Sequence, residues 1–109
     1  MSKLTLNWLA CHVATDGSDT DEVQIWVNGV LKWHGIMVQD GGIKHTPLNK
    51  EASFSGTAKI RIVEADRASN PDLIGDVTAK SSEEGQGELR AWLTGDGSGY
   101  DFAYEVLAN

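Results

Sequence analysis

Apolar and polar residues alternate along most of this chain. Alternating segments recur about every 8–15 positions, and no longer segment keeps the 3.6-residue apolar period of an amphipathic helix. Short alternating segments that are separated by turn residues are typical of an all-β sandwich or barrel. We expect eight strands, at residues 3–13, 22–28, 31–36, 43–48, 56–65, 73–80, 87–93 and 99–107.

The turn residues and the strand parity predict how these strands pack. Asn28-Gly29 predicts a tight type I′ hairpin, because both central positions of that turn need a positive φ. Asp40-Gly41-Gly42 marks another reversal of the chain. Alternation then predicts a core made of Val23, Ile25, Val27, Ala58, Ile60, Ile62, Tyr100, Phe102, Tyr104 and Val106. We therefore expect a two-sheet antiparallel β-sandwich of about eight strands, with its sheets roughly 10 Å apart.

Length and composition limit the possible classes of protein. The 109 residues fit one domain, residues 1–109. No apolar segment approaches the roughly 20 residues that cross a bilayer, and the N-terminus lacks the apolar block of a signal peptide, so we expect a soluble chain. A net charge of −7 without a basic stripe argues against nucleic acid as the main partner. Cys11 is the only cysteine and lies in an apolar strand, where we expect a buried, inert thiol.

The candidate chemistry lies in two acidic loops. Glu64 and Asp66 follow the alternating strand at 58–63, and residues two apart in a strand point the same way. Asp72 can fold back toward them across a short polar loop. Carboxylates about 4 Å apart repel each other by roughly 1–4 kcal/mol at surface dielectrics. A hard cation reverses that sign, and Ca²⁺ accepts about 6–8 oxygen ligands in flexible geometry.

A second acidic segment, residues 16–22, lies between the first two strands. If the two loops meet at one end of the sandwich, their carboxylates form one pocket for Ca²⁺, with Asp16, Asp21, Glu64, Asp66 and Asp72 as its metal ligands. The other interpretation is two solvated loops that stay apart, because Asp is common in turns. Asp40 and Asp96 lie on other turns and are expected to take no part.

The loop pattern resembles a C2 domain, the eight-stranded calcium-binding β-sandwich. In that family a strand ends in an Asp-x-Asp pair, which is followed six residues later by another Asp and then by a hydrophobic-Gly step. Glu64-x-Asp66, Asp72 and Leu73-Ile74-Gly75 match this order and spacing, with Glu64 in place of the usual Asp. Thr20-Asp21-Glu22-Val23 resembles the end of the family's first loop, with Asp16 as the earlier ligand. The chain is also similar to small bacterial proteins with an Asn-Gly hairpin and a Tyr-rich final strand.

The resemblance implies a calcium-binding, non-catalytic binding module. Its acidic loops would coordinate Ca²⁺ and attach the domain to a membrane or a protein partner, with anionic lipid as the family's usual target. Ala14, Ala65, Ala68 and Pro71 are small residues of the predicted loops, so we expect lipid binding to be mainly electrostatic.

Two other functions stay open. Trp26 and Trp33 would form a stacking platform for sugar rings if both faced outward across the Asn28-Gly29 hairpin, whereas the chain's four tryptophans would fill the core if they faced inward. The third possibility is a structural or assembly domain that binds another protein without metal. An enzyme is not expected, because the serines lie in turns, no nucleophile motif is present and the three histidines are scattered.

Overall fold

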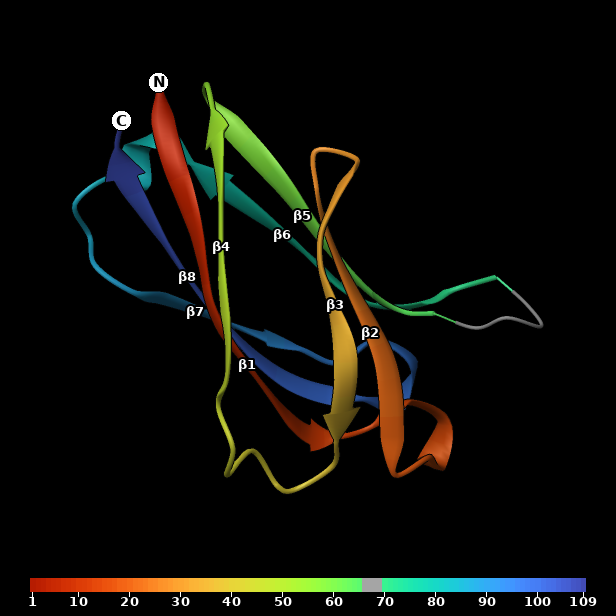
Figure 1. Ribbon diagram of the computed structural model, residues 1–109. Coiled ribbons are helices and arrows are strands. Elements are labelled where there is room, and N and C mark those ends of the chain that lie inside the picture. The colour runs from red at the N-terminus through yellow and green to blue at the C-terminus, as the bar shows by residue number, and fades with distance from the viewer. Residues whose placement is uncertain (66–69) are drawn as a thin grey trace.

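Two four-stranded antiparallel sheets form this molecule (Figure 1). The computed structural model describes residues 1–65 and 70–109. One sheet has the strand order β4-β1-β8-β7 and the other β3-β2-β5-β6. The strands are β1 (Ser2–Val13), β2 (Thr20–Val27), β3 (Val30–Val38), β4 (Thr46–Phe54), β5 (Thr57–Glu64), β6 (Asp72–Lys80), β7 (Leu89–Leu93) and β8 (Gly99–Ala108). Three short 3-10 turns join them, η1 (Thr15–Gly17), η2 (Ser81–Glu83) and η3 (Gly95–Gly97). The expected all-β sandwich is confirmed.

The core fills the space between the two sheets. All ten side chains that alternation assigned to the core are buried, from Val23 on β2 to Val106 on β8. Cys11 is buried among them, as expected. Burying one large aliphatic or aromatic side chain contributes about 1.5–3 kcal/mol. The period-two pattern therefore supplies the apolar surface that holds the sheets together.

One strand differs from its predicted position. Residues 43–48 were expected to be the fourth strand, but β4 begins at Thr46 and ends at Phe54. It pairs with β1 and forms an edge of its sheet. Its inward residues Leu48 and Phe54 are buried, while Lys50 and Glu51 between them are exposed. The polar residues of a solvated edge strand hide its alternation, and this explains the error.

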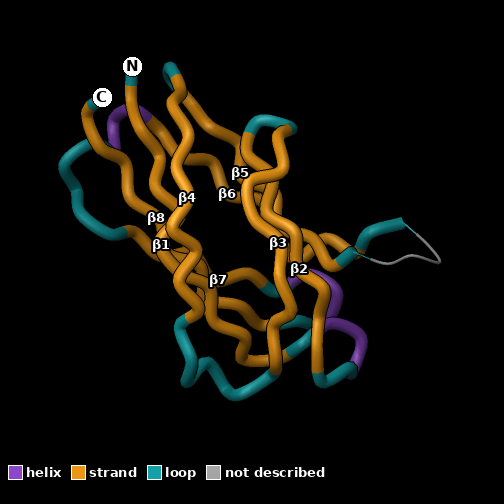
Figure 2. The backbone as a smooth tube through the Cα atoms, viewed as in Figure 1, coloured by secondary structure: helices purple, strands orange, loops and turns teal. Residues whose placement is uncertain are grey.

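The loops lie at both ends of the sandwich. The Asn28-Gly29 hairpin has φ values of 48° and 80°, which confirms the predicted turn. The N- and C-termini lie together at one end, and η1 and the β3–β4 loop lie at the opposite end (Figures 1 and 2). We call that opposite end the acidic end. It includes η1, η3, the C-terminal end of β5 and the N-terminal start of β6. Within the described residues, no helix is long and apolar enough to span a membrane.

Candidate functional site

Several segments that are distant in sequence meet at the acidic end. The β3–β4 loop is held to the end of β1, since Gly42 N donates to the Cys11 carbonyl at 3.2 Å. Gln39 N donates to the Asp19 carbonyl at 2.9 Å, which ties the same loop to the β1–β2 connection. η3 packs against both η1 and β6. A Cβ added at Gly95 would lie 2.0 Å from the Leu73 carbonyl, so glycine permits this close approach.

Glu64 and Asp72 lie directly opposite each other at the point where the β5–β6 loop leaves the sheet. Directly opposite residues in an antiparallel pair have Cβ atoms about 4.5–5.5 Å apart, and like charges there destabilise the pair. The Glu64 carboxylate also accepts the N–H of Glu22 from β2 at 3.4 Å. Strand register therefore brings together two of the predicted ligands.

Asp21 occupies a different environment, because its side chain points into the interior and is 2 % exposed. Its carboxylate accepts the N–H of Thr15 at 3.0 Å, the Thr15 hydroxyl at 2.7 Å and the Tyr100 hydroxyl at 2.5 Å. Asp21 as a metal ligand stays a prediction, and its carboxylate already accepts hydrogen bonds from Thr15 and Tyr100. The protein itself satisfies this carboxylate, which fastens η1 to β2 and β8.

Burial around Asp21 also changes the acidity of its neighbours. Desolvation by burial raises the pKa of Tyr100, and its hydrogen bond to Asp21 raises it further. Burial likewise raises the pKa of the Cys11 thiol, which is 1 % exposed. Both groups stay protonated at neutral pH. The Tyr100 hydroxyl is therefore a permanent donor to the buried carboxylate.

The other predicted ligands lie partly outside what the structure describes. Asp66 falls outside the described residues, and so does the side chain of Asp16, although its backbone lies in η1. Among the described side chains, no three from His, Cys, Asp and Glu lie close enough together to hold a metal ion. Within the residues that the structure describes, the candidate site therefore consists of the Glu64–Asp72 pair.

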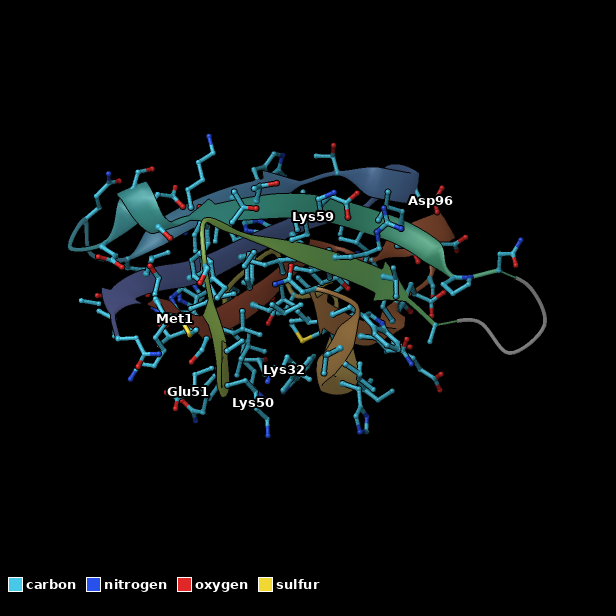
Figure 3. All side chains as sticks on the ribbon, turned by 90° about the horizontal axis from the view of Figure 1, so that it is seen from above. Met1, Lys32, Lys50, Glu51, Lys59 and Asp96 are labelled. Atoms are coloured by element: carbon cyan, nitrogen blue, oxygen red, sulfur yellow. The ribbon has the colours of Figure 1, made fainter. Side chains whose placement is uncertain are left out.

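Asp96 is a residue that sequence reasoning left out. It lies in η3, which packs between η1 and β6, with a left-handed backbone at φ 53° and ψ 42°. Figure 3 shows it toward the end that carries the β5–β6 loop, far from Met1. Aspartate tolerates this conformation better than most residues. Sequence reasoning placed Asp96 on a separate turn, whereas the structure packs that turn against η1 and β6.

Trp26 and Trp33 do not form a joint platform, which was one of the open alternatives. Trp33 is the register partner of the buried Ile25 and packs against the core. Trp26 pairs with Leu31 and lines a groove on the outer face of its sheet. Trp8 stacks on His45, with 3.8 Å between the ring centroids. Trp92 is 56 % exposed on β7. Trp26 and Trp33 therefore lie on opposite faces of one sheet.

Comparison with solved structures places this fold among C2 domains. A structure described as a C2 domain aligns over 99 % of this chain and 100 % of its own, with a TM-score of 0.65 and 10 % identity. A C2 domain of plant extended synaptotagmin 1 aligns over 97 % of this chain and 91 % of its own, with a TM-score of 0.54 and 15 % identity. Human GIVD cytosolic phospholipase A2 aligns over 97 % of this chain but only 15 % of its own length, with a TM-score of 0.55 and 16 % identity.

These similarities establish a C2-like fold, which confirms the resemblance in the loop pattern. No protein-family model and no curated protein sequence matches the chain. At these identities the similarity concerns the path of the backbone alone.

Proposed function

We propose that this domain is a calcium-binding, non-catalytic binding module. The observation that carries the proposal is the Glu64–Asp72 pair, which strand register holds face to face at the start of the β5–β6 loop. A divalent cation bound there replaces a repulsion between two carboxylates by two attractions. Oxygen ligands of this kind suit Ca²⁺, which tolerates irregular geometry and a mixture of carboxylate and carbonyl ligands.

The remaining ligands are assigned by their position in the chain. Asp66 follows Glu64 by two residues. Asp16 lies in η1, and η3 packs against both η1 and β6. Asp96 enters as a further candidate because η3 packs against both η1 and β6. We assign Asp21 a positioning role, since its carboxylate already accepts the hydrogen bonds of Thr15 and Tyr100. It holds η1, and with it Asp16, at the acidic end.

The partner that fits this end is an anionic lipid surface, which bound calcium would attract. Ile43 supports this assignment, because it lies in the β3–β4 loop at the acidic end and is 86 % exposed. Val38 at the end of β3 is 58 % exposed. The sequence pattern placed Ile43 in a strand and predicted mainly electrostatic attachment. Inserting the branched side chain of Ile43 into the lipid would bury apolar surface. This contribution would add to the electrostatic attraction between bound calcium and the anionic lipid.

Thermal unfolding with and without Ca²⁺ tests the metal. Ligand linkage predicts a stabilisation of about 2.7 kcal/mol when calcium is at roughly 100 times its dissociation constant. Mg²⁺ is the control, because it demands a near-ideal octahedron and keeps several waters. An unchanged melting temperature at calcium concentrations on the order of 10 mM, which would saturate even weak extracellular modules, would falsify the calcium site.

Sedimentation with vesicles that contain phosphatidylserine tests the partner. We expect the protein to pellet with calcium and to be released by a chelator. Ile43→Ser should weaken this association mainly at high salt, where charge attraction is screened within about 10 Å. Ile36→Ser on β3 is the matched control, since Ile36 is also exposed, at 62 %, but lies further from the loop. A domain that binds calcium but never pellets would instead have a protein partner.

A further inference from the structure

A groove on the outer face of the β2–β5–β6 sheet lies outside the acidic end. It encloses about 730 Å³ and is lined by residues of these three strands, the Asn28-Gly29 hairpin and Pro71. Lys59, on the part of β5 that lines it, is labelled in Figure 3. The groove takes no part in the proposed calcium site. Its lining combines an indole, an ion pair and an apolar side, each contributed by a different part of the sheet.

Strand register arranges this lining in rows that cross the sheet. Trp26 on β2 is opposite Arg61 on β5, and Arg61 is opposite Asp76 on β6. Arg61 Nε and Nη2 donate to the two carboxylate oxygens of Asp76 at 2.9 and 3.0 Å. The Trp26 indole N–H donates to Gln24 Oε1 at 3.2 Å, which fixes the ring. A flat apolar ring therefore lies in line with a rigid pair of donors and acceptors.

The neighbouring rows complete the groove. Val63 and Leu73, which face each other across β5 and β6, provide an apolar side toward Pro71. Lys59 and Thr78, which form the next pair on the other side, provide polar groups. The ion pair makes its own row neutral overall, although the whole protein carries a net charge of −7.

We propose that this groove binds a neutral oligosaccharide. A sugar ring presents an apolar C–H face, which packs on an indole, and vicinal hydroxyls, each of which donates and accepts. Arg61 has five N–H donors and uses two of them on Asp76, whose oxygens are acceptors only. The pair thus offers a donor beside an acceptor to two adjacent hydroxyls. The protein's net charge of −7 disfavours an anionic ligand, and a purely apolar one leaves both charged groups without water.

Affinity electrophoresis tests the proposal with probes of known composition. Native gels would contain one neutral polysaccharide each: β-glucan, arabinoxylan, galactomannan, xyloglucan or soluble starch. EDTA in every gel keeps the acidic loops free of calcium, so failure here and failure of the proposed calcium site are separate results. We expect at least one polysaccharide to retard the protein. Trp26→Ala should weaken that interaction at least about tenfold.

Matched variants decide between the groove and other surfaces. Trp92→Ala removes an indole that is more exposed but lies on the other sheet, and it should keep full retardation. Asp76→Asn changes an exposed side chain, so it should fold normally and weaken binding several-fold even if Trp26→Ala is unstable. Unretarded migration in all five gels would overturn the proposal. So would an equal loss of retardation in Trp92→Ala, or full retardation in both groove variants.

Discussion

Two acidic sites at one end of this sandwich differ in burial and in the groups that face their carboxylates. Asp21 is buried and accepts hydrogen bonds from the backbone and hydroxyl of Thr15 and from the hydroxyl of Tyr100. Glu64 and Asp72, at the rim, face each other across two strands. The Asp21 carboxylate is part of the fold, whereas strand register sets the like charges of Glu64 and Asp72 opposite each other, where a cation would be stabilising. Acidic residues that are close in sequence to a predicted site can therefore have separate roles.

Among the variants that distinguish these two roles, we expect the largest loss of folding stability from a change at Asp21. Asp21→Ala leaves the Thr15 and Tyr100 donors buried without their acceptor, and each such loss costs about 1–3 kcal/mol. We expect a total loss of about 2–4 kcal/mol in urea unfolding. The loss should be the same in calcium and in EDTA, because it arises in the fold and not in a metal site.

Asp21→Asn is the matched variant, since its amide oxygen preserves part of the acceptor role and it removes the same charge. We expect a smaller loss of stability than in Asp21→Ala. If Asp21→Asn keeps its stability but loses all response to calcium, Asp21 is a ligand and our division between the two sites is wrong.

Alternation could have placed Asp21 correctly. It has the same parity as Val23 and Ile25, which were predicted to face the core, so its side chain also points inward. The motif spacing predicts a ligand at the same position, and alternation alone predicts the burial that the structure shows. By contrast, the Glu64–Asp72 pairing follows directly from two strands joined by a short loop, and it was anticipated.

Other features depend on register and distant packing that a sequence does not reveal. A β-bulge between Ile25 and Trp26 shifts the β2–β3 register, so Trp33 pairs with Ile25. Without the bulge Trp33 would share the outer face with Trp26, which is the arrangement that the open sugar-platform alternative requires. The position of Asp96 depends on the contact between η3 and β6, whose residues are about 20 positions apart in the chain.

The second prediction concerns the rim. Asp72→Asn should remove most of the calcium-dependent stabilisation, which is about 2.7 kcal/mol at roughly 100 times the dissociation constant. In EDTA the variant should be as stable as the parent or slightly more so, because one of two facing charges is gone. Calorimetry with calcium, compared with EDTA, measures both effects.

Glu51→Gln provides the control for charge alone. Glu51 lies on β4 near the end that carries Met1 and is exposed, so this variant removes the same charge far from the rim (Figure 3). We expect its response to calcium to match that of the parent. An equal loss in Glu51→Gln and Asp72→Asn would indicate general charge screening and no defined site.

The smallest expected effect comes from a second tyrosine–carboxylate pair, four residues along β8 from Tyr100. The Tyr104 hydroxyl donates to Glu83 at 3.2 Å. Burial, and then the charge of Glu83, raise the pKa of Tyr104 from 10.0 to about 12. Because the folded-state pKa lies above the unfolded one, the neutral phenol contributes stability that is fully present below pH 10 and lost as the pH rises to about 12.

Tyr104→Phe tests this assignment through the slope of stability against pH. The variant cannot release this proton, so its free energy of unfolding should fall less steeply than that of the parent between pH 10 and about 12. Tyr100, whose pKa is also raised, keeps a residual slope in both proteins. Urea unfolding at several pH values measures the difference, which linkage limits to one proton. Identical slopes would show that Glu83 and burial do not hold the Tyr104 proton, and the parallel with the Asp21–Tyr100 pair would then fail.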